Sequence, residues 1–103
     1  MDASSFLGYV GPSDFHDGSI VSVEHENGAV RVRVRGFSGA IYAVEFEAAQ
    51  IVRRTRAEGM MIYALSELRG EALSRRFAFA NCDEEDDAEL EIDATAFHVR
   101  LDE

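Results

Sequence analysis

The chain has 103 residues and a formal net charge of −10 at pH 7, and nearly half of its residues are apolar. This length predicts one domain covering residues 1–103, and the apolar content together with a single proline excludes a disordered chain. The single cysteine, Cys82, excludes an internal disulfide and a four-cysteine zinc site. Residues 1–14 lack the basic start of a secretory signal, and the longest apolar run, residues 60–65, is too short to cross a bilayer. We therefore expect a soluble, cytoplasmic protein without a membrane partner.

Charge is distributed unevenly along the chain. Residues 83–103 contain ten acidic side chains and one basic residue, Arg100, a net charge of −9, whereas residues 1–82 are close to neutral. All ten basic residues of the chain are arginines. An acidic surface repels the phosphates of nucleic acids and attracts basic proteins. We therefore expect a basic protein as the partner and no nucleic-acid ligand.

An Asn-Gly turn at Asn27 and Gly28 separates two segments in which apolar and polar residues alternate. Asn-Gly between alternating segments is the strongest short-range signal for a two-residue β-hairpin. The turn pairs Glu26 with Ala29, Glu24 with Arg31, Val23 with Val32 and Val21 with Val34. Residues 30–35 alternate valine with arginine and are therefore predicted to be a strand with one apolar face.

A second turn, residues 36–40, predicts a third strand. If Gly39 adopts a left-handed conformation in a three-residue loop, Gly36 pairs with Ala40. This register places Val34 opposite Tyr42, Val32 opposite Val44, Val30 opposite Phe46 and Arg31 opposite Glu45. The three strands then share an apolar face made of Val21, Val23, Val30, Val32, Val34, Tyr42, Val44 and Phe46. The other face carries the row Glu24, Arg31 and Glu45, exposed pairs that stabilise the fold by roughly 0–1 kcal/mol each.

The rest of the chain is also predicted to be mainly strands. Residues 48–59 are expected to be a connection, with a short strand or helical turn at residues 51–52. Residues 60–69 fit either a helical face or an alternating strand, and the neighbouring strands favour the strand. Alternation predicts further strands at residues 77–80, 89–93 and 97–101. The predicted fold class is mainly β, an antiparallel sheet of about six or seven strands in a sandwich or partly open barrel, with room for one short helix within residues 48–70.

The most acidic stretch, CDEEDDAELEID, begins at Cys82. Its first carboxylates match alternate positions of an EF-hand calcium loop, but Ala88 and Ala94 stand where that motif needs Gly and Glu. No metal site is predicted on this pattern. Two main interpretations remain open, a solvated loop that protects the following strand from edge pairing and a partner-binding site. Weak surface association of calcium with the crowded carboxylate oxygens is the third. The partner-binding candidates are Asp83, Glu84, Glu85, Asp86 and Asp87.

The only basic cluster outside the first three strands is Arg53, Arg54 and Arg56. These arginines are candidates for an anion-binding site, and the alternative is that acidic side chains of the same chain neutralise them. The three histidines, His16, His25 and His98, have no metal-ligand spacing on any one element, so a metal site would depend on tertiary contacts.

No catalytic constellation is evident. Ser38 lies in a Gly-rich segment, but it joins two antiparallel strands and not the strand and helix of a nucleophile elbow. Cys82 is followed by five carboxylates, which would raise the pKa of its thiol and weaken it as a nucleophile. We therefore predict no catalytic residue, no cofactor and no enzymatic activity.

The segment Asp14-Phe15-His16-Asp17-Gly18-Ser19-Ile20, followed by the valine hairpin, resembles small bacterial β-sheet families with an F-H-D-S-like start. The resemblance covers residues 14–47, with Gly18 interrupting the Phe-His-Asp-Ser order. Some of these families resemble immunity proteins that neutralise the toxin of a sister cell. The resemblance implies a non-enzymatic, protein-binding role and assigns no catalytic residue.

Two functions follow as expectations. The first is a non-catalytic protein-interaction domain whose acidic C-terminal surface binds a basic partner, as an immunity protein would. The alternative is a small-molecule or metal-binding β-domain, with the possibility of an enzyme, in which Tyr42, Tyr63, His16 and Asp17 lie near a cavity mouth.

Overall fold

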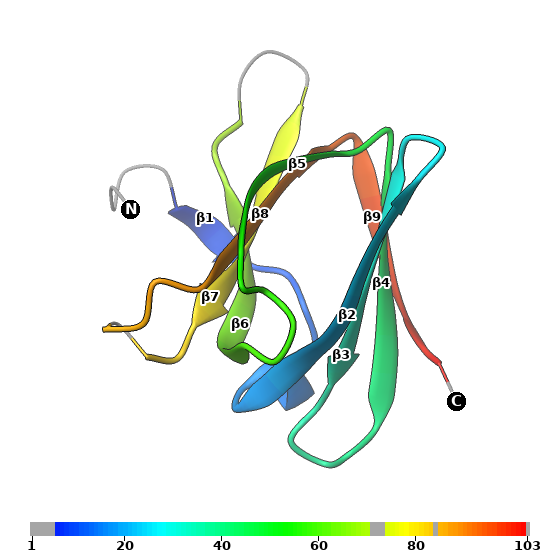
Figure 1. Cartoon of the computed structure of the whole chain (residues 1–103). Helices are drawn as coiled ribbons and strands as arrows, with labels where there is room; N and C mark the ends of the chain where they lie inside the picture. Colours follow the sequence, from blue (N-terminus) through cyan, green and yellow to red (C-terminus); the bar gives the residue numbers. More distant parts are fainter. Residues whose placement is uncertain (1–5, 71–73, 84, 103) are drawn as a thin grey trace.

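The computed structural model describes residues 6–70, 74–83 and 85–102, which form nine β-strands and no α-helix (Figure 1). The strands are β1 (Phe6–Tyr9), β2 (Gly18–Glu26), β3 (Ala29–Arg35), β4 (Ile41–Glu47), β5 (Gln50–Thr55), β6 (Met61–Leu68), β7 (Arg75–Asn81), β8 (Glu89–Ala94) and β9 (Ala96–Leu101). A short 3-10 turn, η2 (Ser13–Phe15), precedes β2. No helix within these residues has the length and apolar character needed to cross a membrane.

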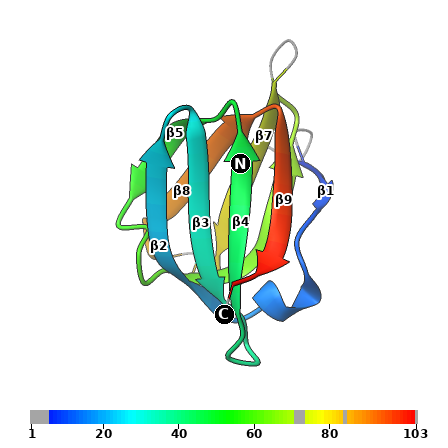
Figure 2. The same cartoon turned by 90° about the vertical axis from the view of Figure 1, so that its right-hand side faces the viewer.

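The strands form one open sheet in which the paired strands are antiparallel, with the order β5-β8-β7-β6-β2-β3-β4-β9 and with β1 added to β6. The sheet folds over on itself, so that β2, β3, β4 and β9 form one layer and β5, β6, β7 and β8 face them (Figures 1 and 2). β2 belongs to both layers because Gly18 and Ser19 pair with β6 while the rest of the strand pairs with β3. The predicted mainly β, antiparallel class is confirmed.

The apolar core lies between the two layers. Phe46 of β4 is fully buried, and its ring centroid lies 5.3 Å from that of Phe77 and 6.1 Å from that of Phe79, both on β7. Phe97 of β9 completes the cluster at 4.9 Å from Phe77. Truncating a buried phenylalanine to alanine costs about 3–5 kcal/mol, so this cluster is a main contact between the layers.

The predicted strand number was too low, and the predicted helix was wrong. β1 was missed, and β5 was anticipated only as a short strand or helical turn at residues 51–52. A bulge between Ile51 and Arg53 breaks the alternation in β5, which explains why its pattern gave no clear signal. Residues 48–70 contain β5 and β6 instead of a helix. A second bulge, between Ile62 and Ala64, places Ile62 and Leu65 together in the core. Leu68 is buried on the other face of the strand, so three buried residues at a spacing of three imitate a helical face without sharing one side.

The predicted register is right around both turns and wrong at the start of β2. Glu26 pairs with Ala29 and Val23 with Val32, and the whole predicted register of β3 with β4 is observed. A bulge between Ile20 and Ser22 then shifts the pairing, so that Ile20 lies opposite Val34 and is buried. Val21, which was predicted to belong to the apolar face, is instead exposed.

Residues 14–20, which begin within η2 and continue into β2, contact both layers of the sheet. Phe15 is fully buried, and its ring packs edge-on against Tyr42. Asp17 has a left-handed φ of 64°, a conformation that Asp tolerates better than most residues, and its N–H donates to the Ile62 carbonyl at 3.0 Å. A Cβ at Gly18 would lie 2.6 Å from the Arg35 carbonyl oxygen, so only glycine fits. The Phe, Asp and Gly of this segment thus have structural roles, and His16 is left at the surface.

Candidate functional site

The predicted partner-binding residues lie in the connection between β7 and β8, which we call the acidic loop (residues 83–87). Glu84 falls outside the described residues. Asp83 shapes the loop: its N–H donates to Asn81 Oδ1 at 2.8 Å, and its Oδ1 accepts from the Glu85 N–H at 2.9 Å. Asp86 Oδ1 likewise accepts from the Ala88 N–H at 3.3 Å. These hydrogen bonds fix the backbone at Asp83, Glu85 and Asp86, so the carboxylates of these three residues start from defined turn positions.

The predicted anion-binding arginines do not converge on one point. Arg56 bonds Asp86 at 3.0 Å and also contacts the Asp87 carboxylate. Arg54 bonds Glu58 at 2.5 Å, and Arg53 lies 3.4 Å from Glu91. Each of the three arginines is thus paired with a carboxylate of the same chain, as the alternative interpretation of the sequence expected.

Arg56 has an electrostatic effect on one residue of the acidic loop in particular. The hydrogen bond from Arg56, followed by that from the Asn81 amide, lowers the pKa of Asp86 below its usual range. Asp86 is therefore held as a carboxylate and is already occupied by an internal cation. It is less available to a partner than the neighbouring residues Asp83 and Glu85.

Three carboxylates near Cys82 have no arginine within ion-pair distance in the described part of the chain. They are Asp17, Asp83 and Glu85. Asp17 belongs to this corner of the fold because its Oδ1 lies 3.8 Å from Cys82 Sγ. Burial, and then the charge of Asp17, raise the pKa of the Cys82 thiol, so little thiolate forms at neutral pH.

A row of aromatic side chains lies on β1 and β6, beside this corner. The Phe6 ring lies 5.0 Å from Tyr9, Tyr9 lies 5.8 Å from Tyr63, and Tyr63 lies 4.9 Å from His16. Met61 is exposed on the same strand as Tyr63, and its carbonyl accepts from the Cys82 N–H at 3.0 Å. We call Phe6, Tyr9, His16, Met61 and Tyr63 the aromatic patch. The sequence indicated Tyr63 and His16 as neighbours, but it gave no signal for Phe6 or Tyr9.

The other residues predicted at a cavity mouth have different surroundings. His16 and Asp17 line a shallow depression of about 320 Å³ together with Ser13, Asp14 and Phe37. Tyr42 is not part of its lining, although the Tyr42 hydroxyl donates to Asp14 at 2.9 Å.

The histidines stay apart. His16 contacts Tyr63 and Asp17, His98 contacts Glu47, and His25 is exposed near the end of β2. Across residues 6–70, 74–83 and 85–102, no three His, Cys, Asp or Glu side chains are grouped so that they could hold a metal ion.

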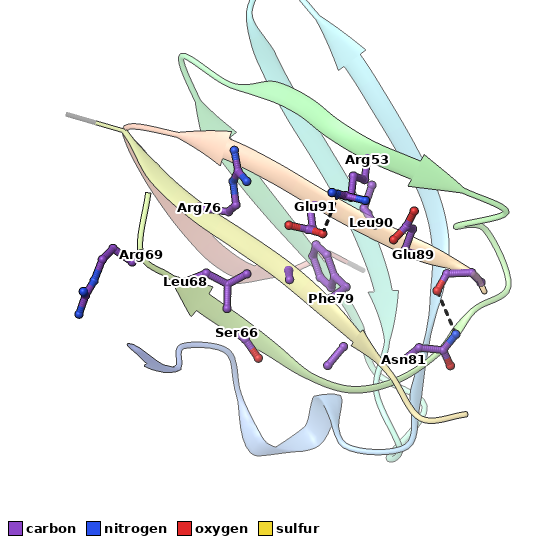
Figure 3. A pocket seen from close by; sticks show the side chains of 13 residues that line it. Arg53, Ser66, Leu68, Arg69, Arg76, Phe79, Asn81, Glu89, Leu90 and Glu91 are labelled. Carbon is purple, nitrogen blue, oxygen red and sulfur yellow. Dashed lines mark hydrogen bonds and ion pairs between the residues drawn. The ribbon is translucent and has the colours of Figure 1, made fainter. Parts of the chain in front are cut away.

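A groove of about 510 Å³ lies beside β7 and β8 (Figure 3). The pairing of β7 with β8 ends at Ala78 and Glu91. The groove is lined by residues of both strands beyond this last pair, together with residues of β6 such as Ser66. Small side chains such as Ser66 and Ala80 combine with charged ones such as Arg53. Arg53 and Glu91, which lie opposite each other on the paired strands β5 and β8, form an ion pair within the lining.

Comparisons of this chain with protein-family models, with curated proteins and with solved structures found no significant match. Any functional proposal therefore has to be argued from the surface chemistry of the chain.

Proposed function

We propose that this protein is a non-catalytic interaction domain that binds a basic protein partner through the acidic loop and the neighbouring Asp17. The observation that carries this proposal is the corner at Cys82. There Asp83 and Glu85 lie on a hydrogen-bonded turn that follows Cys82, and Asp17 contacts Cys82. None of the three carboxylates has an arginine partner among the described residues. Carboxylates fixed in this way are ready to meet arginine or lysine side chains of another protein.

The charge balance of the whole surface supports the same proposal. Within the described residues, eight of the ten arginines form ion pairs with carboxylates of the same chain. Described carboxylates without an arginine partner, such as Asp17, Asp83 and Glu85, contribute to the net charge of −10. A field of this sign accelerates the association of a basic protein and repels nucleic acid.

The resemblance of residues 14–47 to immunity-like families gives the proposal a biological form. In that form the partner is a basic toxin of a bacterial cell, and binding in the cytoplasm neutralises it. This role needs a stable, charged surface and no catalytic residue, in keeping with a fold in which Cys82 is a weak nucleophile.

A pull-down with matched baits tests the proposal. The parent protein, the double variant Asp83→Asn/Glu85→Gln and the control variant Glu24→Gln/Glu26→Gln are immobilised and exposed to the same bacterial lysate. Both variants lose the same charge, but only the first loses it at the acidic loop. We expect the parent and the control to retain a basic protein at low salt and release it at high salt, and the acidic-loop variant to retain much less. Equal retention on all three baits, or no salt-sensitive protein on any, would contradict the proposal.

A further inference from the structure

The aromatic patch is an apolar surface that nothing within the described chain covers. Tyr9 is 60% exposed, Met61 50% and Tyr63 45%, and Phe6 adds a further exposed ring. The ring-to-ring contacts make this surface continuous from β1 across β6 to His16. Continuous exposed apolar surface on a folded domain marks interaction sites, and tyrosine and methionine are enriched at the centres of protein interfaces.

We propose that the aromatic patch is the central contact of the partner-binding surface, and that the partner inserts an apolar side chain flanked by arginines or lysines. This inference deepens the proposed function and rests on it. The acidic loop then supplies attraction at the rim, while the tyrosines supply most of the binding free energy at the centre.

Hydrogen bonds and contacts place the two parts of this surface side by side. The Cys82 N–H donates to the Met61 carbonyl, and Cys82 Sγ contacts Asp17, so the start of the acidic loop borders the patch. His16, which packs on Tyr63, is the residue before Asp17. A partner seated on Tyr63 is therefore within reach of carboxylates on two sides.

Charge determines which occupant fits. The segments that carry Phe6, Tyr9 and His16 contain no arginine or lysine. Arg69 follows Leu68, which pairs with Phe6, and so lies at the end of the aromatic patch away from Met61 and the acidic loop. Nucleic acid and anionic membranes would be repelled by Asp17 and Asp83. A second copy of the chain, meeting through a two-fold axis, would bring the same carboxylates against each other. A basic protein segment has the opposite charge and is the occupant that the surface fits.

The tyrosine rings match the same partner chemistry. Arginine and lysine side chains bind over the faces of tyrosine rings by cation–π attraction, and their aliphatic parts pack on apolar surface. Partial burial and the adjacent Tyr63 hydroxyl raise the pKa of Tyr9, so its ring carries a neutral hydroxyl at physiological pH. Tyr9 and Tyr63 can thus contact both the apolar and the cationic side chains of one segment.

Two synthetic peptides of equal charge test the inference, one alternating arginine with leucine and the other alternating arginine with serine. Affinities are measured for the parent, for Tyr9→Thr/Tyr63→Thr, for Asp83→Asn/Glu85→Gln and for the control Leu101→Ser. Leu101 is an exposed apolar residue on β9, in the other layer. Amide NMR shifts of the parent locate the bound peptide, and circular dichroism checks that each variant is folded. The single variants Tyr9→Thr and Tyr63→Thr replace the double variant if it does not fold.

We expect the parent to bind the arginine–leucine peptide more tightly than the arginine–serine peptide, with NMR shifts centred on Tyr9, Met61 and Tyr63. The tyrosine variant should lose about tenfold or more in affinity for the arginine–leucine peptide and keep the salt dependence of the parent. The acidic-loop variant should instead lose salt dependence, and Leu101→Ser should bind like the parent.

Other outcomes overturn the inference in distinguishable ways. If the acidic-loop variant loses binding while the tyrosine variant binds as the parent does, the inference is wrong and the proposed function stands. If neither peptide binds the parent at low salt, the inference and the proposed function are both wrong. If the parent sediments as a dimer and the tyrosine variant as a monomer, a second copy occupies the patch and the inference is wrong.

Discussion

At the scale of single residues, Asp14 of η2 forms hydrogen bonds with the loop between β3 and β4. Its carboxylate accepts from the Ser38 hydroxyl at 2.6 Å, from the Ser38 N–H at 3.0 Å and from the Tyr42 hydroxyl at 2.9 Å. The Asp14 carbonyl also accepts from the Phe37 N–H. The Ser38 bonds, ahead of the Tyr42 bond, lower the pKa of Asp14 below its ordinary value of about 3.9. Ser38 is thus a turn residue that donates to an aspartate.

These contacts predict a pH-dependent contribution of Asp14 to stability. Because the pKa of Asp14 is lower in the folded state than in the unfolded state, its contribution is complete above the unfolded pKa and is lost as the pH falls through the folded value. The variant Asp14→Asn should therefore be less stable than the parent near pH 6, and the difference should shrink below about pH 4. Thermal unfolding of both proteins across this range measures the difference.

Glu26→Gln is the matched control for this titration. Glu26 is an exposed carboxylate on β2 with no hydrogen bond to another described residue. Its variant should unfold like the parent throughout the pH range. A constant stability difference between the parent and Asp14→Asn from pH 6 down to pH 3 would mean that the Ser38 and Tyr42 bonds do not depend on the charge of Asp14.

At the scale of elements, the sequence predicts structure wherever turn chemistry sets the register. Asn27 and Gly28 both have positive φ, as a two-residue hairpin turn requires, and Gly39 has a φ of 93° in the second turn. From these turns the pairing of β3 with β4 follows residue by residue, and its pairing with β2 follows as far as the bulge between Ile20 and Ser22. The pattern fails at the bulges in β2, β5 and β6, because one extra residue moves every later side chain to the opposite face.

The bulge in β2 leads to a direct mutational test. Ile20 is 1% exposed and faces Val34, whereas its neighbour Val21 is 41% exposed. Ile20→Ala should lower the free energy of unfolding by about 2–5 kcal/mol because it leaves a cavity in the core. Val21→Ala should change it by no more than about 0.5 kcal/mol. Chemical denaturation of the two variants compares them. A larger effect at Val21 would restore the simple alternation and show that the bulge is absent.

At the scale of the whole molecule, long-range strand pairing assembles the candidate site. Arg56 reaches Asp86 because β5 pairs with β8, and Tyr9 reaches Tyr63 because β1 pairs with β6. No local pattern encodes either contact, since propensity and alternation describe neighbours in sequence. The acidic loop was predictable from composition alone. Its partial neutralisation by Arg56, and the aromatic patch beside it, depend on tertiary pairing.

The excess of negative charge predicts opposite responses to two kinds of variant. Asp83→Asn/Glu85→Gln removes two carboxylates that have no arginine partner among the described residues, and it keeps an oxygen for the Glu85 N–H. Arg56→Gln removes the cation that Asp86 and Asp87 share. In a protein with a net charge of −10, the first change reduces repulsion and the second increases it.

At low ionic strength the melting temperature should rise slightly for the double variant and fall for Arg56→Gln. Both shifts should shrink as salt shortens the Debye length from about 30 Å at 0.01 M to about 3 Å at 1 M. Thermal unfolding in a salt series measures both shifts, and a fall in melting temperature for the double variant at low salt would show that the acidic loop stabilises the fold through a contact other than those described.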